Sequence, residues 1–198
     1  MSIYLLKSSF QNLLRPLVVR LESGGATANQ VTLAAAIVSI AIGAALIAKP
    51  IHLLFFAVPV WMFLRMALNA IDGMLAREYG QKSALGGYFN EIGDVISDAA
   101  LFAPFALVSP FAPPWIGAII FLATLTEFAG VLGVPHGNGR RYDGPMGKSD
   151  RAFVFGALGT WIAVSGGLPQ WAWWLQPLLC LLLLWTTANR IRLGLKRD

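Results

Sequence analysis

The sequence has few charged residues and almost no cysteine. Only 13% of its 198 residues are charged, against about 25% in soluble globular domains, while 57% are hydrophobic. This composition excludes an ordinary soluble domain. The single cysteine, Cys180, excludes an intrachain disulfide and a cysteine-rich metal site. Neither His52 nor His136 has a second histidine at metal-ligand spacing. We expect no cleaved signal peptide, because Arg15 and Arg20 interrupt the first apolar stretch.

Long apolar runs account for most of the chain. They extend over residues 31–48, 51–71, 84–108, 113–134, 152–167 and 171–189, and a helix needs about 20 residues to cross a bilayer. Residues 3–21 instead have apolar residues at helical spacing opposite polar ones, which is typical of an amphipathic helix at the membrane interface. We therefore predict an all-α integral membrane protein, with an amphipathic juxtamembrane helix in residues 1–25 and a domain of six transmembrane helices in residues 26–198.

The basic residues indicate how the chain is oriented. Thirteen of the fifteen Lys and Arg lie in the N-terminal segment, in residues 77–83 and 136–151, and in the C-terminal tail. The alternate connections are almost free of them, so the positive-inside rule puts both termini in the cytoplasm. The net charge of +5 is explained by anionic lipid rather than nucleic acid, which we do not expect as a partner. We expect the plasma (inner) membrane as the location.

Polar residues form two stripes at helical spacing on the second and third predicted spans. The first stripe consists of Asn69, Asp72, Gly73 and Ala76, and the second of Gly86, Asn90, Asp94 and Asp98. Polar groups are costly within a membrane span, so such clusters indicate function. Two facing stripes would gather the oxygen ligands that Mg²⁺ or Mn²⁺ requires. The turn between them, with Arg77, Lys82 and Ser83, would cover an anionic ligand.

The segment from Asp72 to Arg77, together with Gly86 and Asp94, resembles the signature of the CDP-alcohol phosphatidyltransferases, D-x-x-D-G-x-x-A-R-x8-G-x3-D-x3-D. Six of its eight fixed positions match, and Asn69 and Asn90 stand where the family has acidic residues. The family's six membrane helices after an amphipathic helix agree with the predicted elements. The resemblance implies that a phosphatidyl group is transferred from CDP-diacylglycerol to an alcohol with release of CMP. It also implies a homodimer in the lipid bilayer, with the active site facing the cytoplasm.

The resemblance assigns a role to particular residues. Asp94 would be the catalytic base. The ligands of Mg²⁺ or Mn²⁺ would be Asn69, Asp72, Asn90 and Asp94, at the positions where the family holds two divalent metals, and whether this chain binds one or two stays open. The CDP donor would be bound by Asn29, Thr32, Gly73, Arg77 and Ser83. The acceptor would be bound by Lys148, Arg151 and Arg190. Because asparagine carries no charge, we expect weak metal binding, for which Asp98 or Glu91 would compensate as accessory acids.

Two other functions stay open from the sequence. The chain is either an active transferase or a catalytically impaired relative that has lost the chemistry through Asn69 and Asn90 and binds CDP-lipid. A small membrane transporter is a third possibility, disfavoured because the acids gather at one end of the spans and the two halves show no repeat. Glu127, a lone acid in the fourth span, either tunes the site or pairs with Arg65. For Asp98, interhelical hydrogen bonding is an alternative role.

Overall fold

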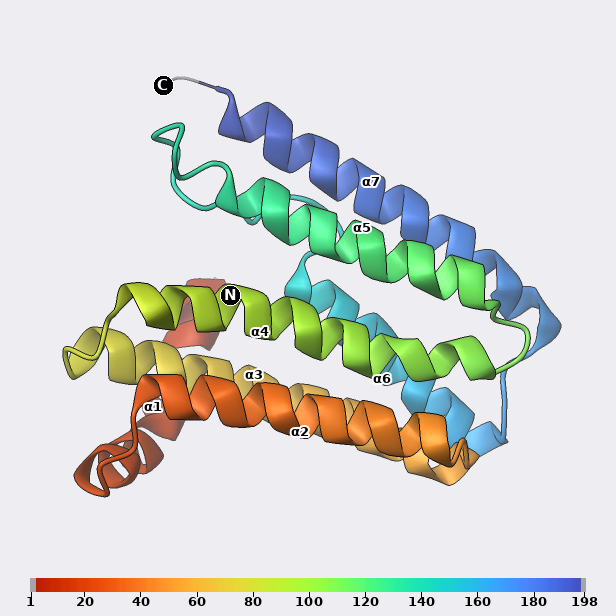
Figure 1. The fold of residues 1–198 in the computed structure, drawn as a ribbon, viewed down its shortest axis with the longest axis horizontal. Helices are drawn as coiled ribbons and strands as arrows, with labels where there is room; N and C mark the ends of the chain where they lie inside the picture. The colour runs from red at the N-terminus through yellow and green to blue at the C-terminus, as the bar shows by residue number, and fades with distance from the viewer. Residues whose placement is uncertain (1–2, 197–198) are drawn as a thin grey trace.

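The computed structural model describes residues 3–196, which form helices and no strands (Figure 1). The predicted limits at residues 1–2 and 197–198, and the side chains of residues 3–8, lie outside the described residues. The long helices are α1 (Ile3–Ser23), α2 (Ala28–Ala48), α3 (Ala57–Glu78), α4 (Ala84–Phe102), α5 (Pro113–Val131), α6 (Lys148–Ser165) and α7 (Leu175–Gly194). Three short 3-10 helices are η1 (His52–Phe56), η2 (Ala103–Leu107) and η3 (Gln170–Trp174). The prediction of an all-helical protein is confirmed.

Helices α2 to α7 run alongside one another in a bundle. The α1–α2 connection, the α3–α4 turn and the C-terminal ends of α5 and α7 lie at one end of it, on the left in Figure 1. Within residues 3–196, four segments are long and apolar enough to cross a membrane: Ala28–Ala48, His52–Glu78, Pro113–Val131 and Gln170–Gly194. Helices α4 and α6 fall short of that composition because each carries three charged residues.

We call the end of the bundle that carries the basic connections the basic end. Side-chain caps determine where the helices at this end begin. The Thr27 side chain accepts a hydrogen bond from the backbone N–H of Gln30, and the Gln30 side chain accepts one from Thr27, so α2 starts before the apolar run itself. The Asp150 carboxylate accepts from the Gly147 N–H at 2.9 Å, and α6 begins at Lys148. The sequence prediction put these starts at residues 31 and 152, because it followed hydropathy and not the caps.

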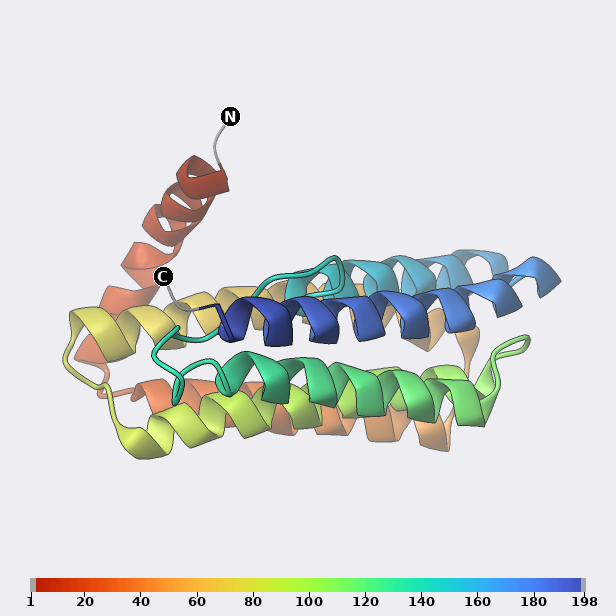
Figure 2. The same ribbon diagram turned by 90° about the horizontal axis from the view of Figure 1, so that it is seen from above.

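Helix α1 projects from the side of the bundle (Figure 2). Val18 is its buried contact residue and belongs to a small apolar cluster with Ile71, Met74 and Leu75 of α3. The opposite face is exposed, and Leu13 is 75% accessible. An apolar face left outside the bundle agrees with the predicted amphipathic helix.

The bundle core is apolar at the end remote from the basic loops. Phe102 of α4 stacks on Phe155 of α6 with their ring centroids 3.7 Å apart, and Phe105 meets Phe155 edge-on. Helices α2 and α4 approach closely at Gly43, where a Cβ atom would collide with the backbone of Ala100. The packing therefore leaves the polar groups concentrated toward the other end.

Buried ion pairs join the helices between the apolar core and the basic end. The Arg151 guanidinium of α6 is 1% exposed and donates to Asp98 of α4 at 2.9 and 3.0 Å and to Glu127 of α5 at 2.8 Å. Arg65 of α3 donates to the other oxygen of Asp98 at 2.6 Å. Arg190 of α7 lies 3.4 Å from Glu127. We call these five residues the ionic core.

The contacts of the ionic core decide between the alternative roles that the sequence left open for Glu127 and Asp98. Glu127 does not pair with Arg65, as one alternative had it, because Arg65 reaches Asp98 instead. Asp98 has both carboxylate oxygens bound to arginines, so it joins helices α3, α4 and α6. Charges inside a membrane helix bundle are retained only where they are compensated, and each of these groups has at least one opposite partner.

We expect the Asp98→Asn substitution to destabilise the fold strongly. It leaves Arg65 and Arg151 buried with one carboxylate fewer between them, a change that costs about 3–5 kcal/mol. Glu78→Gln is the matched control, because it removes an exposed carboxylate that pairs with Arg15 at 2.5 Å and is worth less than about 1 kcal/mol. Denaturant titration in micelles measures both free energies of unfolding. Equal losses for the two variants would contradict a structural role for Asp98.

Candidate active site

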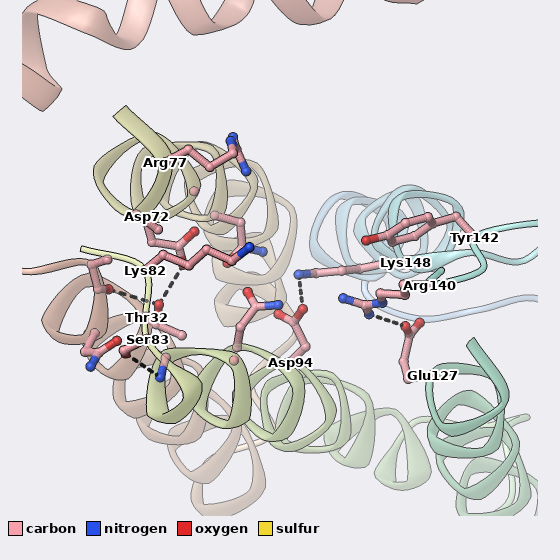
Figure 3. Close-up of a pocket in the computed structure, with 18 of the residues that line it drawn as sticks. Thr32, Asp72, Arg77, Lys82, Ser83, Asp94, Glu127, Arg140, Tyr142 and Lys148 are labelled. Atoms are coloured by element: carbon pink, nitrogen blue, oxygen red, sulfur yellow. Dashed lines mark hydrogen bonds and ion pairs between the residues drawn. The ribbon is translucent and has the colours of Figure 1, made fainter. Parts of the chain in front are cut away.

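A pocket of about 670 Å³ lies at the basic end of the bundle, between α2, α3, α4, the start of α6 and the loop that precedes it. Figure 3 shows its side chains converging from these elements on a common space. It is lined by Ala28, Asn29, Thr32, Asn69, Asp72, Gly73, Ala76, Arg77, Gln81, Lys82, Ser83, Gly86, Gly87, Asn90, Asp94, Glu127, Arg140, Tyr142, Gly147, Lys148, Ser149, Asp150 and Arg190. We call the part formed by α2, α3 and the first turns of α4 the first half, and the part formed by α5, α6, α7 and the loop the second half.

The first half depends on close contact between α2 and its neighbours. Thr32 donates a hydrogen bond to Asp72 at 2.7 Å, which joins α2 to α3. Gly86 of α4 lies against α2, where an added Cβ would stand 2.7 Å from the side-chain oxygen of Asn29. A side chain at this position would displace Asn29 from the pocket wall, so the glycine keeps the wall open.

Ser83 and two cations close the first half. The Ser83 hydroxyl caps α4 by accepting from the Gly86 N–H at 3.0 Å. Arg77 and Lys82 are exposed and line the pocket. Neither of them takes part in any ion pair among residues 3–196. Two uncompensated cations beside a helix N-terminus form an environment that suits phosphate groups.

Asp94 lies where the two halves meet. One carboxylate oxygen accepts from Arg65 at 3.1 Å, and the other contacts the ammonium group of Lys148 (Figure 3). Arg65 also donates to the backbone carbonyl of Asp94 at 3.1 Å. Because Arg65 is a buried residue of the ionic core, it holds Asp94 in a fixed orientation with the second oxygen toward the pocket.

The second half contains a carboxylate beside every cation. Arg140 donates to Glu127 at 3.0 Å (Figure 3). It also contacts Glu91. Its guanidinium lies over the ring of Tyr142, 4.9 Å from the ring centre. Burial lowers the pKa of Arg140, but the charges of Glu91, Tyr142 and Glu127 outweigh it and raise the pKa above its ordinary value. Arg140 therefore stays cationic and fixes the loop to α4 and α5.

Most of the residues singled out in the sequence meet in this pocket. All the predicted metal and donor ligands line it, and so do Lys148 and Arg190. Arg151, Asp98 and Glu91 do not, because the first two are held in the ionic core and Glu91 faces Arg140. Sequence reasoning missed the site positions of Tyr142, Ser149, Asp150 and Gln81. Nothing in the sequence distinguishes Tyr142 from an ordinary interfacial aromatic residue.

The predicted metal ligands provide two carboxylates and two amide oxygens at the pocket. Within residues 3–196 no group of three or more His, Cys, Asp or Glu side chains is arranged to hold a metal ion. Asp72 and Asp94 are the carboxylates of the predicted ligand set, and Asn69 and Asn90 add neutral oxygens. Two carboxylates balance the charge of one divalent ion, and amide oxygens are acceptable ligands for Mg²⁺ or Mn²⁺.

Comparison with known proteins gives matches along nearly the whole chain. The inner membrane protein YnbA of Escherichia coli K12 is 44% identical over 195 residues, which cover 97% of this chain and 96% of that protein. Two crystal structures of the Mycobacterium tuberculosis phosphatidylinositol phosphate synthase PgsA1 share the fold. The one with manganese and citrate has a TM-score of 0.74 at 17% identity and covers 92% of each chain. The one with CDP-DAG bound has a TM-score of 0.71 at 20% identity, covering 92% of this chain and 96% of that one.

A family match agrees with the family that the sequence signature predicted. Residues 26–186 match the family described as CDP-alcohol phosphatidyltransferase. The match spans the region from the start of α2 to the middle of α7 and so includes both halves of the pocket except Arg190. The chain belongs to the CDP-alcohol phosphatidyltransferase family.

Proposed function

We propose that this protein transfers a phosphatidyl group from CDP-diacylglycerol to an alcohol and releases CMP. The observation that carries the proposal is the pocket itself, in which the predicted donor ligands and both signature aspartates converge. Arg77 and Lys82 provide uncompensated positive charge for the pyrophosphate. Asn29, Thr32, Gly73 and Ser83 line the same half and are proposed to contact the nucleotide. The CDP-DAG in the mycobacterial relative supports this choice of donor.

The proposed reaction is a single displacement at the phosphorus that carries the diacylglycerol. The acceptor hydroxyl oxygen forms a bond to this phosphorus while the bond to the bridging oxygen of CMP breaks, and CMP leaves with the electron pair. The hydroxyl proton passes to the Asp94 oxygen that Lys148 contacts, since Arg65 occupies the other oxygen. Lys148 therefore has to give up part of this contact when the acceptor binds.

We propose one divalent cation, Mg²⁺ or Mn²⁺, as the cofactor. Asp72 and Asp94 would hold it with the neutral oxygens of Asn69 and Asn90. When bound, it would polarise the phosphoryl group and neutralise charge on the departing CMP. The manganese in the mycobacterial structure supports a divalent cation in this fold. Lys148 contributes a further positive charge at the same carboxylate.

One second function is favoured by specific residues. Asn69 and Asn90 remove two charges from the family's ligand set, and the Lys148 ammonium group contacts the proposed base. These features support a relative that binds CDP-lipid without turning it over. Incubation of the purified protein with CDP-diacylglycerol, Mn²⁺ or Mg²⁺ and a panel of alcohols separates the two functions, because only the transferase releases CMP.

In the membrane, we propose that α2 to α7 all cross the bilayer and that the pocket opens to the cytoplasm. The charged side chains of α4 and α6 are directed at partners within the bundle, which makes both helices compatible with lipid on their outer faces. The basic connections share the pocket's end of the bundle, and this supports cytoplasmic termini (Figure 1). The inner-membrane location of YnbA supports the same compartment.

Cysteine labelling in cells tests the orientation. In a Cys180→Ala background, a membrane-impermeant maleimide added from outside should modify a cysteine at Pro113, the exposed first residue of α5. It should leave a cysteine at His136 unmodified, because that exposed loop residue faces the cytoplasm. Permeabilised cells provide the control, since both positions should then react. Labelling of position 136 alone in intact cells would reverse the proposed orientation.

Replacing the proposed base tests the chemistry. Asp94→Asn keeps the size of the side chain and removes its ability to take a proton. We expect the rate of CMP release to fall by about 10²–10⁴-fold. Asp143→Asn is the matched control, because Asp143 pairs with Arg141 outside the pocket and its loss should leave the rate unchanged. A folded Asp94→Asn protein with the wild-type rate would refute the assignment of the base.

The two asparagines allow a test of the metal site that is independent of activity. In the double variant Asn69→Asp, Asn90→Asp, we expect half-maximal Mn²⁺ binding at a concentration at least about tenfold lower, because carboxylate charge increases affinity for hard cations. Mn²⁺ titration followed by electron paramagnetic resonance measures this value directly. Asn12→Asp on the exposed part of α1 is the control for added charge. Unchanged affinity in the folded double variant would exclude Asn69 and Asn90 as ligands.

A further inference from the structure

The two halves of the pocket differ in how their cations are compensated. In the first half, Arg77 and Lys82 have no ion-pair partner in the described part of the chain. In the second half, every lining cation has a carboxylate within ion-pair distance: Arg140, Lys148 and Arg190. One half therefore presents unpaired cations to a ligand, and the cations of the other half are each in contact with a carboxylate.

Glu127 is the carboxylate that the arginines of this half share. Its side chain is 6% exposed and receives Arg151 at 2.8 Å, Arg140 at 3.0 Å and Arg190 at 3.4 Å. Arg190 also donates to the backbone carbonyls of Thr126 at 2.6 Å and Asp143 at 3.3 Å. Each arginine of this half is thus already in contact with a carboxylate of the protein.

Glu91 completes the compensation of Arg140, the most accessible of these arginines. Its carboxylate contacts Arg140 from α4, on the side opposite Glu127. The Arg140 side chain is 18% exposed, so it is the guanidinium that a ligand in the second half would meet first. Two carboxylates face it, and a phosphate group entering here would be repelled by both.

We propose that the acceptor alcohol carries no net charge and no phosphate group. This inference rests on the proposed function, because it assigns the second half of the pocket to the acceptor. Hydroxyl groups donate to carboxylates and accept from guanidinium or ammonium groups, so a polyol or a zwitterionic amino alcohol fits paired charges. A phosphomonoester would have to compete with a carboxylate for each lining arginine and lysine of this half.

The proposal differs from the acceptor-phosphate role that the family resemblance implied for Lys148, Arg151 and Arg190. That role requires all three cations to be available. Lys148 contacts the proposed base Asp94 until the acceptor binds, Arg190 is held by Glu127, and Arg151 is buried in the ionic core. We assign Glu91 and Glu127 instead as the residues that determine acceptor specificity.

Acceptor selectivity and its change in a charge variant test the proposal. The purified full chain is given CDP-diacylglycerol and Mn²⁺ with glycerol, serine or glycerol 3-phosphate, and CMP release is measured. We expect glycerol or serine to exceed glycerol 3-phosphate by at least about tenfold in kcat/KM. Glu91→Gln uncovers Arg140 and should raise the relative kcat/KM for glycerol 3-phosphate by about tenfold. Glu78→Gln, which removes an exposed acid of the same kind from α3, should not change the ratio.

A binding measurement separates this proposal from the proposed function. Calorimetric titration of glycerol 3-phosphate should detect no binding to the wild type and measurable binding to Glu91→Gln, whether or not CMP is released. Glu127→Gln, if it folds, should give the larger gain in affinity for glycerol 3-phosphate. If it does not fold, Glu91→Gln still tests the proposal, because the Glu91 side chain is 30% exposed. Absence of CMP release with every alcohol would defeat the proposed function alone. Wild-type binding of glycerol 3-phosphate, or a folded Glu91→Gln protein that does not gain it, would overturn the acceptor proposal.

Discussion

The contact of Arg151 with Asp98 and Glu127 is the constraint on which the rest of the arrangement depends. Three charges with at most 9% side-chain exposure are stable in an apolar bundle only while they remain together. Helices α4, α5 and α6 must therefore keep one relative register. Arg65 extends the constraint to α3 through Asp98. Any sliding of one of these helices would separate a buried charge from its partner.

The pocket lies one helical turn beyond this constraint. Asp94 precedes Asp98 by four residues on α4, so it lies on the same helix face and nearer the basic end. Arg65 binds both aspartates and couples the orientation of Asp94 to the ionic core. The polar residues near the pocket thus divide into two groups. Those deeper in the bundle hold the helices together, and those nearer the basic end remain available to a ligand.

The sequence predicted the helix faces correctly and the partners across helices poorly. The four-residue spacing from Gly86 through Asp94 predicted a shared face, and those side chains do line the pocket. The same spacing put Asp98 in the site, but Asp98 is bound by two arginines from other helices. Periodicity reports which way a side chain points from its own helix. It carries no information on which residue of a distant helix it meets, so the partners of Glu127 were not predictable.

The family signature is informative about one substrate and silent about the other for a structural reason. Its fixed positions lie between residues 69 and 94, on α3 and α4, and these helices with α2 form the first half of the pocket. The second half is built from Glu127, Arg140 and Arg190, which come from α5, the following loop and α7. A ligand in that half meets charges set by residues outside the signature. Under the proposed function, this division lets members of one family keep a common donor while the balance of paired and unpaired charge in the second half selects a different acceptor.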